Sequence, residues 1–312
     1  MSHAFAADDG DLDAAPYTET QFQASYSYSS ANSSTMPIMM GFVFLGYFAL
    51  LTVYLSFCCV GRQVYSFQAL TNVEQQTIAG GKPQLPGPVA HLDEIWRKQF
   101  IVKVYGILCI QLAVTVAICF GMMQFGGYKL MVWTYTDGAW TRLASFVGTL
   151  FFLISLMCYK NRHPLNLILL GLFTLSMSYL IGVSCTAYAA LGYSVVVVEA
   201  LAITSLLFVG LTMFVMYSKM DFSFLGMVLP VLFLSLLIFG LFTMLAFDSF
   251  AMRQAYALGG CLLFVLYILF DTSMIIQHLE YDDYVLGAVE LYLDFINLFM
   301  FVLQCLMTGR RD

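Results

Sequence analysis

The feature that most constrains this chain is a series of long stretches without any charged residue. They cover residues 20–61, 104–128, 143–159, 163–198, 200–218, 222–247 and 254–270. A helix that rises about 1.5 Å per residue needs about 20 residues to cross roughly 30 Å of hydrocarbon, and most of these stretches approach or exceed that length. Charged residues make up only 10% of the chain, too few to cover a soluble globule of 312 residues. The sequence therefore predicts an all-α polytopic membrane protein.

Composition divides the chain into four segments. Residues 1–35 are polar and acidic and lack the basic start of a cleaved signal peptide, so we expect a disordered tail. Residues 36–60 are predicted to form an additional transmembrane span, followed by a polar linker at 61–95 that several Gly and Pro residues interrupt. Residues 96–312 form the main membrane domain, with spans expected near 100–124, 143–159, 164–187, 193–217, 224–246, 254–278 and 284–307.

The distribution of lysine and arginine predicts how the spans are oriented. Residues 1–35 hold no Lys or Arg, whereas 61–99 hold four. Because cytosolic loops are enriched in these residues, we place the linker in the cytosol with 160–163 and 217–223, and the amino terminus on the lumenal or outer side. Arg310 and Arg311 then fall on the non-cytosolic side if the last segment crosses completely. Either that segment re-enters the membrane or the rule fails locally.

Several classes of function have no support in the sequence. No basic tract suggests nucleic acid binding, and the chain has no nucleophile elbow, P-loop, dinucleotide fingerprint or HExxH motif, so we expect no enzyme and no cofactor. The eight cysteines lie almost entirely within apolar runs, where buried thiols are the ordinary interpretation. Cys58-Cys59, at the end of an apolar run, is an alternative site of palmitoylation.

Acidic residues inside the apolar runs are the candidate functional residues. A charged side chain at the centre of a membrane helix costs at least about 2.5 kcal/mol, so it is retained for a reason. In the last span, one helix face carries Glu290, Asp294, Asn297, Phe301 and Gln304. In the preceding span, a similar stripe contains Tyr267, Asp271, Met274 and His278. We therefore expect the two spans to form an antiparallel hairpin with these stripes inside.

If Asp271 and Asp294 meet in that hairpin, their chemistry follows from burial. A low dielectric disfavours the charged form of each carboxyl group and a second carboxylate disfavours it further, so the two groups tend to share a proton. Such a pair is a proton-operated switch, and its deprotonated oxygens attract a hard cation such as calcium. The alternative is two separate acids that hold helices in register through neighbouring hydroxyl or backbone groups.

Two further residues have both a functional and a structural interpretation. Glu199 is either a cation ligand or an acid that bonds a neighbouring Ser or Thr during helix packing. Arg162 either caps a span at the lipid head groups or extends its long stem to an inward-facing carboxylate. The spacings Ser178-xxx-Gly182 and Gly226-xxx-Pro230 indicate close helix packing.

Four segments resemble one known family in their motifs and in the order of those motifs. They are LFDTSMIIQHLEYDDYVLGAVELYLDFINLFMFVLQCL at 269–306, IWRKQFIVKVYGILCIQLAVTV at 95–116, NRHPLNLILLGLFTLSMSYLIG at 161–182 and SKMDFSFLG at 218–226. Residues 95–312 resemble the transmembrane Bax inhibitor motif family, also called lifeguard or Bax-inhibitor-like proteins. The resemblance implies a seven-helix fold in which six helices surround a central last helix.

The resemblance also implies a function. Members of the family are described as pH-sensitive calcium leak pathways, and the eukaryotic ones as suppressors of cell death. The family's paired aspartates match Asp271 and Asp294, and its basic partner residue matches Arg162, with Lys160 as the alternative. Two features depart from the family pattern: the extra span at 36–60, and Glu290 as a third acid, which adds a cation ligand or shifts the titration of the pair.

Three hypotheses for function follow from the residues and the resemblance. The first is a calcium leak channel, gated by Asp271 and Asp294 with Arg162, whose cation pathway includes Glu290, Glu199 and Asn297. The second is a non-transporting scaffold that binds membrane-embedded cell-death or calcium-handling proteins. The third is a calcium/proton exchanger that uses the same carboxylates. The expected location is the endoplasmic reticulum or Golgi membrane, with the plasma membrane as the alternative.

Overall fold

The computed structural model describes residues 94–159, 162–218, 224–245, 249–277 and 283–310, with the single residues 220, 222 and 279. The predicted tail at 1–35, the predicted extra span at 36–60, Cys58-Cys59 and nearly all of the linker lie outside the described residues. Within the described part all regular elements are helices. They are α2 (Glu94–Gly121), η2 (Met122–Gly126), α3 (Gly127–Tyr135), α4 (Ala139–Cys158), α5 (Leu165–Ala190), α6 (Ser194–Ser218), α7 (Leu225–Leu245), α8 (Phe250–Gln277) and α9 (Tyr284–Gly309).

The described helices include seven segments that are long and apolar enough to cross a membrane. The prediction of an all-α polytopic membrane protein is therefore confirmed, and each predicted span after residue 95 has a matching helix. The first segment is longer than predicted, because α2 continues through the π-helical turn η2 into α3. Gly127 directly after that turn has a φ of 44°, a backbone conformation that glycine adopts readily.

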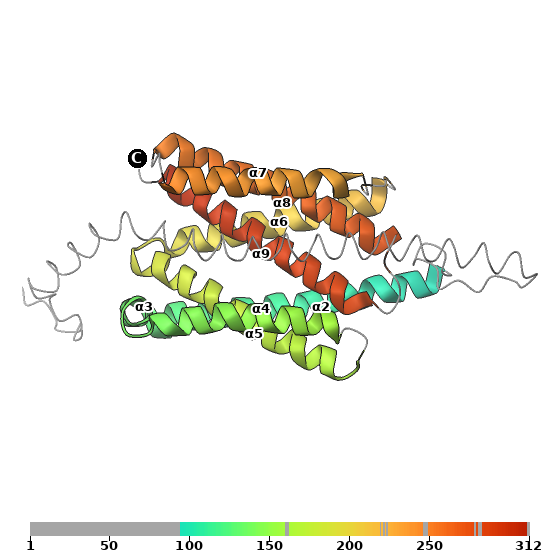
Figure 1. Ribbon diagram of the computed structural model, residues 1–312, viewed down its shortest axis with the longest axis horizontal. Helices are drawn as coiled ribbons and strands as arrows, with labels where there is room; N and C mark the ends of the chain where they lie inside the picture. The colour runs from blue at the N-terminus through green and yellow to red at the C-terminus, as the bar shows by residue number, and fades with distance from the viewer. Residues whose placement is uncertain are drawn as a thin grey trace, which may run out of the picture. The chain divides into compact units, whose positions relative to one another are not determined.

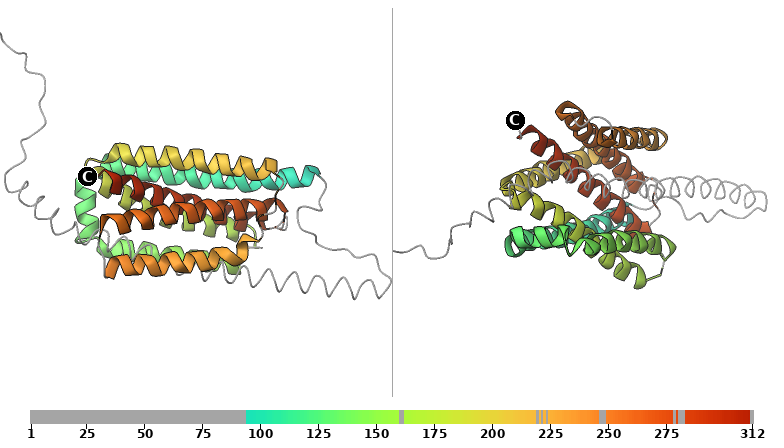
Figure 2. Two further views of the ribbon diagram at one scale, coloured as in Figure 1. Left: turned by 90° about the horizontal axis from the view of Figure 1, so that it is seen from above. Right: turned by 60° about the vertical axis from the view of Figure 1, so that its left-hand side comes forward.

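The last helix lies at the centre of the bundle, as the resemblance implied. In its most apolar stretch 94% of the residues are buried, against 17% to 56% for the other six segments. Figures 1 and 2 show α9 running obliquely through the middle, with α2, α6 and α8 packed against it. A membrane helix that contacts lipid on one side can carry polar residues only on its inward face. Because α9 is surrounded by protein on every side, it is not restricted in this way.

The hairpin of α8 and α9 is confirmed by their close packing along both helices. Near one end, Gly260 leaves room for the Phe301 ring, and the rings of Phe264 and Phe301 stack with centroids 5.8 Å apart. Near the other end, a side chain at Gly287 would meet Ile275 at 3.2 Å. Small residues thus let the two helices approach closely where they cross.

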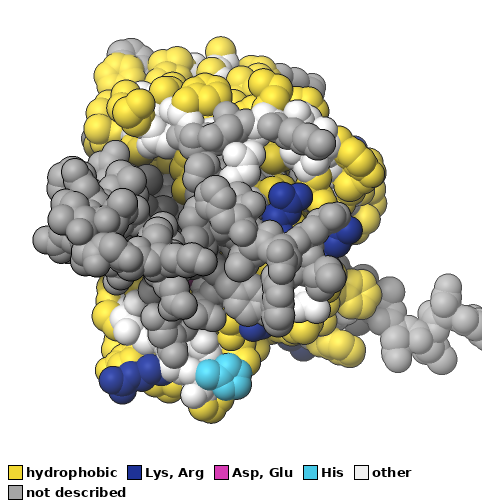
Figure 3. Space-filling view, turned by 90° about the vertical axis from the view of Figure 1, so that its right-hand side faces the viewer, with side chains coloured by type: hydrophobic (Ala, Val, Ile, Leu, Met, Phe, Trp, Pro, Cys, Tyr) yellow, Lys and Arg dark blue, Asp and Glu magenta, His cyan; other side chains and the backbone are white. Residues whose placement is uncertain are grey.

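Successive helices run in opposite directions, which groups the loops at two ends of the bundle. We call the end that holds Glu94, Gln277 and Tyr284 the Gln277 end, and the end that holds Ser194 and Gly309 the Gly309 end. The end of α4 and the end of α6 also lie at the Gln277 end, so the described residues of the segments that we predicted to be cytosolic (94–99, 162–163 and 217–218) share one side. Figure 3 looks at this end and shows exposed basic and histidine side chains near a hydrophobic rim.

The predicted small-residue spacings both mark helix contacts. A Cβ atom at position 182 would lie 2.5 Å from Met122 Sδ and 3.7 Å from Cys119 Cα. The helices α5 and α2 are therefore packed too closely here for a larger residue than glycine. A side chain at Gly226 would meet the Phe270 ring at 3.0 Å, where α7 touches α8. These contacts fix α2 and α7 against the helices that border α9.

Candidate functional site

Three acids of the predicted stripes are buried in the centre of the bundle. Asp271 on α8 is 2% exposed, and on α9 Glu290 is 3% and Asp294 2% exposed. Glu290 and Asp294 are four residues apart, so they project from one face of α9 toward the same region. Burial of three carboxyl groups in a lipid-embedded bundle requires that each be protonated or paired.

The structure brings Asp271 and Asp294 together. Their carboxyl groups lie within hydrogen-bonding reach, and Glu290 acts on Asp294 through its charge. An ionised carboxylate only accepts hydrogen bonds, so two carboxyl groups can bond each other only while at least one of them carries a proton. Removal of that proton turns an attractive contact into a repulsive one. The arrangement therefore has the chemistry of a proton-dependent latch between α8 and α9.

The acids are not arranged as a ready metal site. Among the described residues no group of three or more His, Cys, Asp and Glu side chains is placed to hold a metal ion. Asn297, the next member of the predicted stripe, is 1% exposed and uses its Nδ2 to donate to the Leu293 carbonyl at 2.7 Å. That hydrogen bond stays within α9.

Glu199 is far from this cluster. It lies near the start of α6 at the Gly309 end, about 40% exposed, and accepts two hydrogen bonds from Arg310 Nη2, the shorter at 2.6 Å. The contact also bears on the topology question, because α9 is an unbroken helix of 26 residues that ends beside α6. At about 39 Å it is long enough to cross the membrane completely, and Glu199 neutralises the charge of Arg310 there.

Arg162 lies at the Gln277 end, exposed, between α4 and α5. Its guanidinium stacks over the Tyr159 ring with 5.6 Å between Cζ and the ring centroid. Within the described residues it forms no ion pair with Asp271 or Asp294, and its part in gating stays a prediction. Lys160 and His278, the other polar residues considered near this end, lie outside the described residues.

A second buried polar network was not predicted from the sequence. Thr115 of α2 shares hydrogen bonds of 2.9 Å with Ser178 of α5 and with the Tyr292 hydroxyl of α9, and Gln111 donates to Thr174 at 3.0 Å. The signal was available, because Gln111 and Thr115, and likewise Thr174 and Ser178, are four residues apart in apolar runs. Unlike the carboxyl cluster, this network has a partner for each hydroxyl group, so it locks α2, α5 and α9 together.

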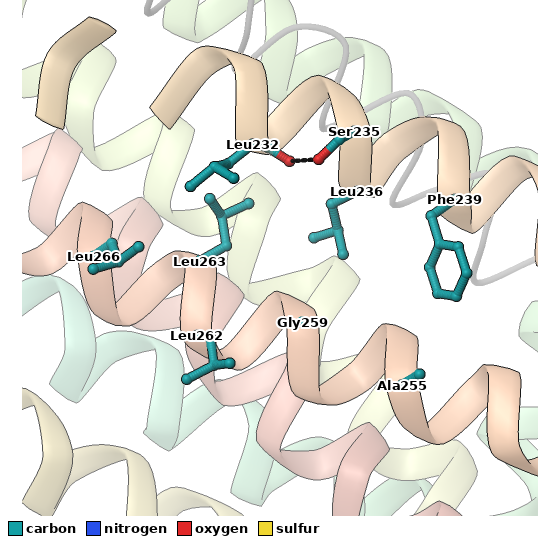
Figure 4. Close-up of a pocket in the computed structure, with 9 residues that line it drawn as sticks. All are labelled: Leu232, Ser235, Leu236, Phe239, Ala255, Gly259, Leu262, Leu263 and Leu266. Atoms are coloured by element: carbon teal, nitrogen blue, oxygen red, sulfur yellow. Dashed lines mark hydrogen bonds between the residues drawn. The ribbon is translucent and has the colours of Figure 1, made fainter. Parts of the chain in front are cut away.

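An open groove between α7 and α8 has different chemistry. Figure 4 shows that leucine side chains, Phe239, Ala255 and Gly259 line it, and that the one hydroxyl, of Ser235, is used by the Leu232 carbonyl at 2.7 Å. No charged group lines this groove, and Leu262 at its edge is 67% exposed. Its lining is almost entirely apolar, so it offers no ligand to an ion.

The fold and the central acids define a class: a multi-pass integral membrane protein whose described part has a buried, acid-bearing last helix at its centre. Residues 97–311 match the family model Bax1-I, described as "Inhibitor of apoptosis-promoting Bax1". The match covers more than two thirds of the chain, so the protein belongs to this Bax inhibitor family, as the motifs predicted.

Named relatives support the lifeguard branch of the family. "Protein LIFEGUARD 3" of Arabidopsis thaliana is 32% identical over 230 residues, which cover 72% of this chain and 90% of the relative. "Protein LIFEGUARD 1" of the same plant is 34% identical over 230 residues, covering 72% and 94%. The "Golgi anti-apoptotic protein" of Vaccinia virus (strain Lister) is 35% identical over 216 residues, covering 69% and 87%.

Proposed function

We propose that this protein is a pH-sensitive calcium leak channel of an intracellular membrane, gated by Asp271 and Asp294. The observation that carries the proposal is the contact between two buried carboxyl groups on neighbouring helices of the central hairpin. The cations that such oxygens select are hard ones, calcium among them. Calcium is here the permeant ion, and the protein needs no cofactor for this activity.

The sign of the pH effect follows from the latch. At low pH the shared proton holds α8 and α9 together and the pathway is closed. As pH rises, both groups become anionic, they repel each other, and their oxygens become available to a divalent cation. Two charges that move from about 3 Å to about 6 Å apart gain about 3 kcal/mol at an effective dielectric of about 20, enough to reverse a two-state equilibrium. Calcium flux should therefore increase with pH.

The test is calcium flux into liposomes that contain the full-length protein, measured at a series of pH values. Asp271→Asn and Asp294→Asn should each flatten the dependence of flux on pH, because each variant removes the repulsion and one cation ligand. The matched control is Asp137→Asn, the same change at an exposed residue in the turn between α3 and α4, which should leave the profile unchanged. Wild-type flux and pH response in both buried variants would refute gating by the pair.

The same assay separates the other two hypotheses. A non-transporting scaffold would give no flux above empty liposomes at any pH. A calcium/proton exchanger would use an opposing proton gradient to drive calcium uptake against a calcium gradient, and a protonophore would abolish that uphill uptake. The leak proposed here requires only the calcium gradient and persists without a proton gradient.

We also place the leak in a cellular role, the suppression of cell death through the calcium content of an internal store. The description of the family and the name of the viral relative support an anti-apoptotic role, and that name points to the Golgi membrane. Expression in cells should lower the calcium content of the store and raise survival after a death stimulus. If Asp294→Asn protected cells as well as the wild type, protection would be independent of the pH gating of the leak.

A further inference from the structure

The connection between α2 and α4 holds a short helix, α3, that does not continue in the direction of α2. The 28 residues of α2 rise about 42 Å, more than the roughly 30 Å of hydrocarbon that a span has to cross. A straight helix of all 39 residues from Arg97 to Tyr135 would be about 58 Å long, whereas a bilayer with its head groups is only about 40–45 Å thick. The residues after Gly121 therefore need another direction.

The π-helical turn η2 and Gly127 change the direction of the chain. Gly127 has a φ of 44° and a ψ of −140°, which lies outside the helical region, so the axis of α3 is turned away from that of α2. The left-hand view of Figure 2 shows α3 lying across one end of the bundle, while α2 runs along its length. This is the Gly309 end. The helix α3 thus lies at the level where the membrane spans end.

One face of α3 is fixed on the bundle. Met131 and Thr134 on this face are buried, and α3 packs against α5. Where α3 ends, the Gly138 N–H donates to the Trp133 carbonyl at 2.7 Å. A Cβ atom at position 138 would lie 2.7 Å from the Trp133 ring, so this ring rests directly on the glycine. The helix is therefore a packed element with a fixed orientation, and its other face is exposed by construction.

The exposed face of α3 carries aromatic side chains and one lysine. Phe125, in the turn before α3, is 93% exposed. Tyr128, Lys129 and Trp133 lie on the exposed side of α3, and Trp140 is exposed at the start of α4. Tryptophan and tyrosine combine an apolar ring with one polar group, and they are enriched where hydrocarbon meets head groups. A lysine on such a face directs its ammonium group toward the phosphates.

A helix face that contacts hydrocarbon has a different composition in this bundle. The span α7 contains no tyrosine, tryptophan or charged residue, and its exposed side chains include Met227, Val231, Leu234 and Ile238. The exposed face of α3 would be unfavourable at that depth, because Lys129 would lose its hydration. It would also be unfavourable in water, because Phe125 and Trp133 would form an exposed apolar patch. The boundary between the two environments suits both kinds of side chain.

We propose that α3 is an in-plane anchor, whose exposed face docks onto the phospholipid head-group region of the same bilayer in the leaflet at the Gly309 end. The aromatic rings lie at the boundary with the acyl chains, and Lys129 faces the phosphate groups. In this part of the chain only α2 crosses the hydrocarbon, and the first span ends at the π-helical turn. The anchor sets the depth of α2 and, because α3 packs on α5, of that helix too. This inference rests on the membrane fold and is independent of the leak function.

The experiment measures the depth of single tryptophans with phospholipids that carry a nitroxide quencher. The three tryptophans of the chain are Trp96, Trp133 and Trp140. Replacing the other two with phenylalanine leaves Trp133 alone in one full-length variant and Trp140 alone in another. Each variant is reconstituted into phosphatidylcholine liposomes with the nitroxide either at the head group or deep in an acyl chain. We expect the head-group label to quench both tryptophans about twofold or more strongly than the deep label.

The matched control is Leu234→Trp in a variant whose three native tryptophans are all replaced with phenylalanine. Leu234 lies in the middle of α7 and is 54% exposed, so a tryptophan there should be quenched more strongly by the deep label. Trp133 reports on α3 itself, and Trp140 gives the reading if the Trp133 variant does not fold. Stronger quenching by the deep label would place α3 in hydrocarbon and refute the proposal. Quenching by neither label would mean that the face contacts water or protein, which would equally refute it.

Discussion

The hydroxyl network between α2, α5 and α9 gives a quantitative test of the packing. The perturbations are Tyr292→Phe, Thr115→Val and the double variant. Tyr292 is 0% exposed, and its hydroxyl shares a 2.9 Å hydrogen bond with Thr115, which is 3% exposed. Tyr292→Phe removes one hydroxyl and leaves Thr115 bonded to Ser178 and to its own helix. Because Thr115 keeps these partners, the single change should cost only about 1 kcal/mol of unfolding free energy.

Thr115→Val should cost somewhat more, about 1–2 kcal/mol, because it removes a shared partner from both Tyr292 and Ser178. The double variant no longer contains the Thr115–Tyr292 contact, so its cost should be smaller than the sum of the two single costs. Hydrogen bonds between membrane helices give coupling energies that average about 0.6 kcal/mol and reach about 1.7 kcal/mol. We expect a value near the upper half of this range, since both groups are fully enclosed by protein.

The assay is unfolding of the full-length protein by sodium dodecyl sulfate titration in mixed micelles, followed by tryptophan fluorescence. The same variants are tested for calcium flux, and the position of the pH response should not move, because the hydrogen bonds of this network join α2, α5 and α9 and not the α8–α9 contact. If the costs of the two single variants add up to the cost of the double variant within about 0.3 kcal/mol, the two hydroxyl groups do not contact each other. That result would refute the register of α2 against α9.

Three further predictions address the acid cluster, the helix packing and the amino terminus. Glu290→Gln should shift the midpoint of the pH dependence of flux and keep its steepness, because Glu290 acts on Asp294 through charge without being part of the contact; a flattened profile would contradict this. The thiols of Cys119 and Cys185 touch across α2 and α5, so copper phenanthroline should link them into a disulfide that tryptic mass spectrometry detects and Cys119→Ser abolishes. An epitope at the amino terminus should resist protease added to sealed microsomes, because residues 36–60 are predicted to cross the membrane; digestion from the cytosolic side would disprove that span.

Much of the fold could be predicted because the hydrocarbon of the membrane restricts which backbone structures are possible. In hydrocarbon every backbone group has to be bonded within its own segment, so an apolar run of sufficient length specifies a helix. The ends of those helices were less certain. The run that begins near residue 100 was expected to stop near 124, but Gly121, Gly126 and Gly127 carry the chain through a π-helical turn into α3. A pattern of apolar residues contains no information about such a turn.

The candidate site was predicted in part, for a related reason. The spacing of Glu290 and Asp294 on one face, and the short turn before them, indicated which acids would face α8. The same reasoning could not place Glu199, because its partner Arg310 is 111 residues away and lies outside any periodic pattern. Contacts between distant helices depend on tilt and register, which the sequence pattern does not contain.

The two buried polar networks have different roles in the bundle. In the first, Thr115, Ser178 and Tyr292 satisfy one another, so that movement of α2 against α9 would break good hydrogen bonds with no compensation in lipid. In the second, Asp294 has an oxygen without a partner and depends on a proton for its contact with Asp271. A satisfied network has one stable arrangement, whereas an unsatisfied one can gain bonds by moving or by taking up water or a cation. Variants in the first network should therefore change stability with little effect on flux, and variants in the second should change flux with little effect on stability.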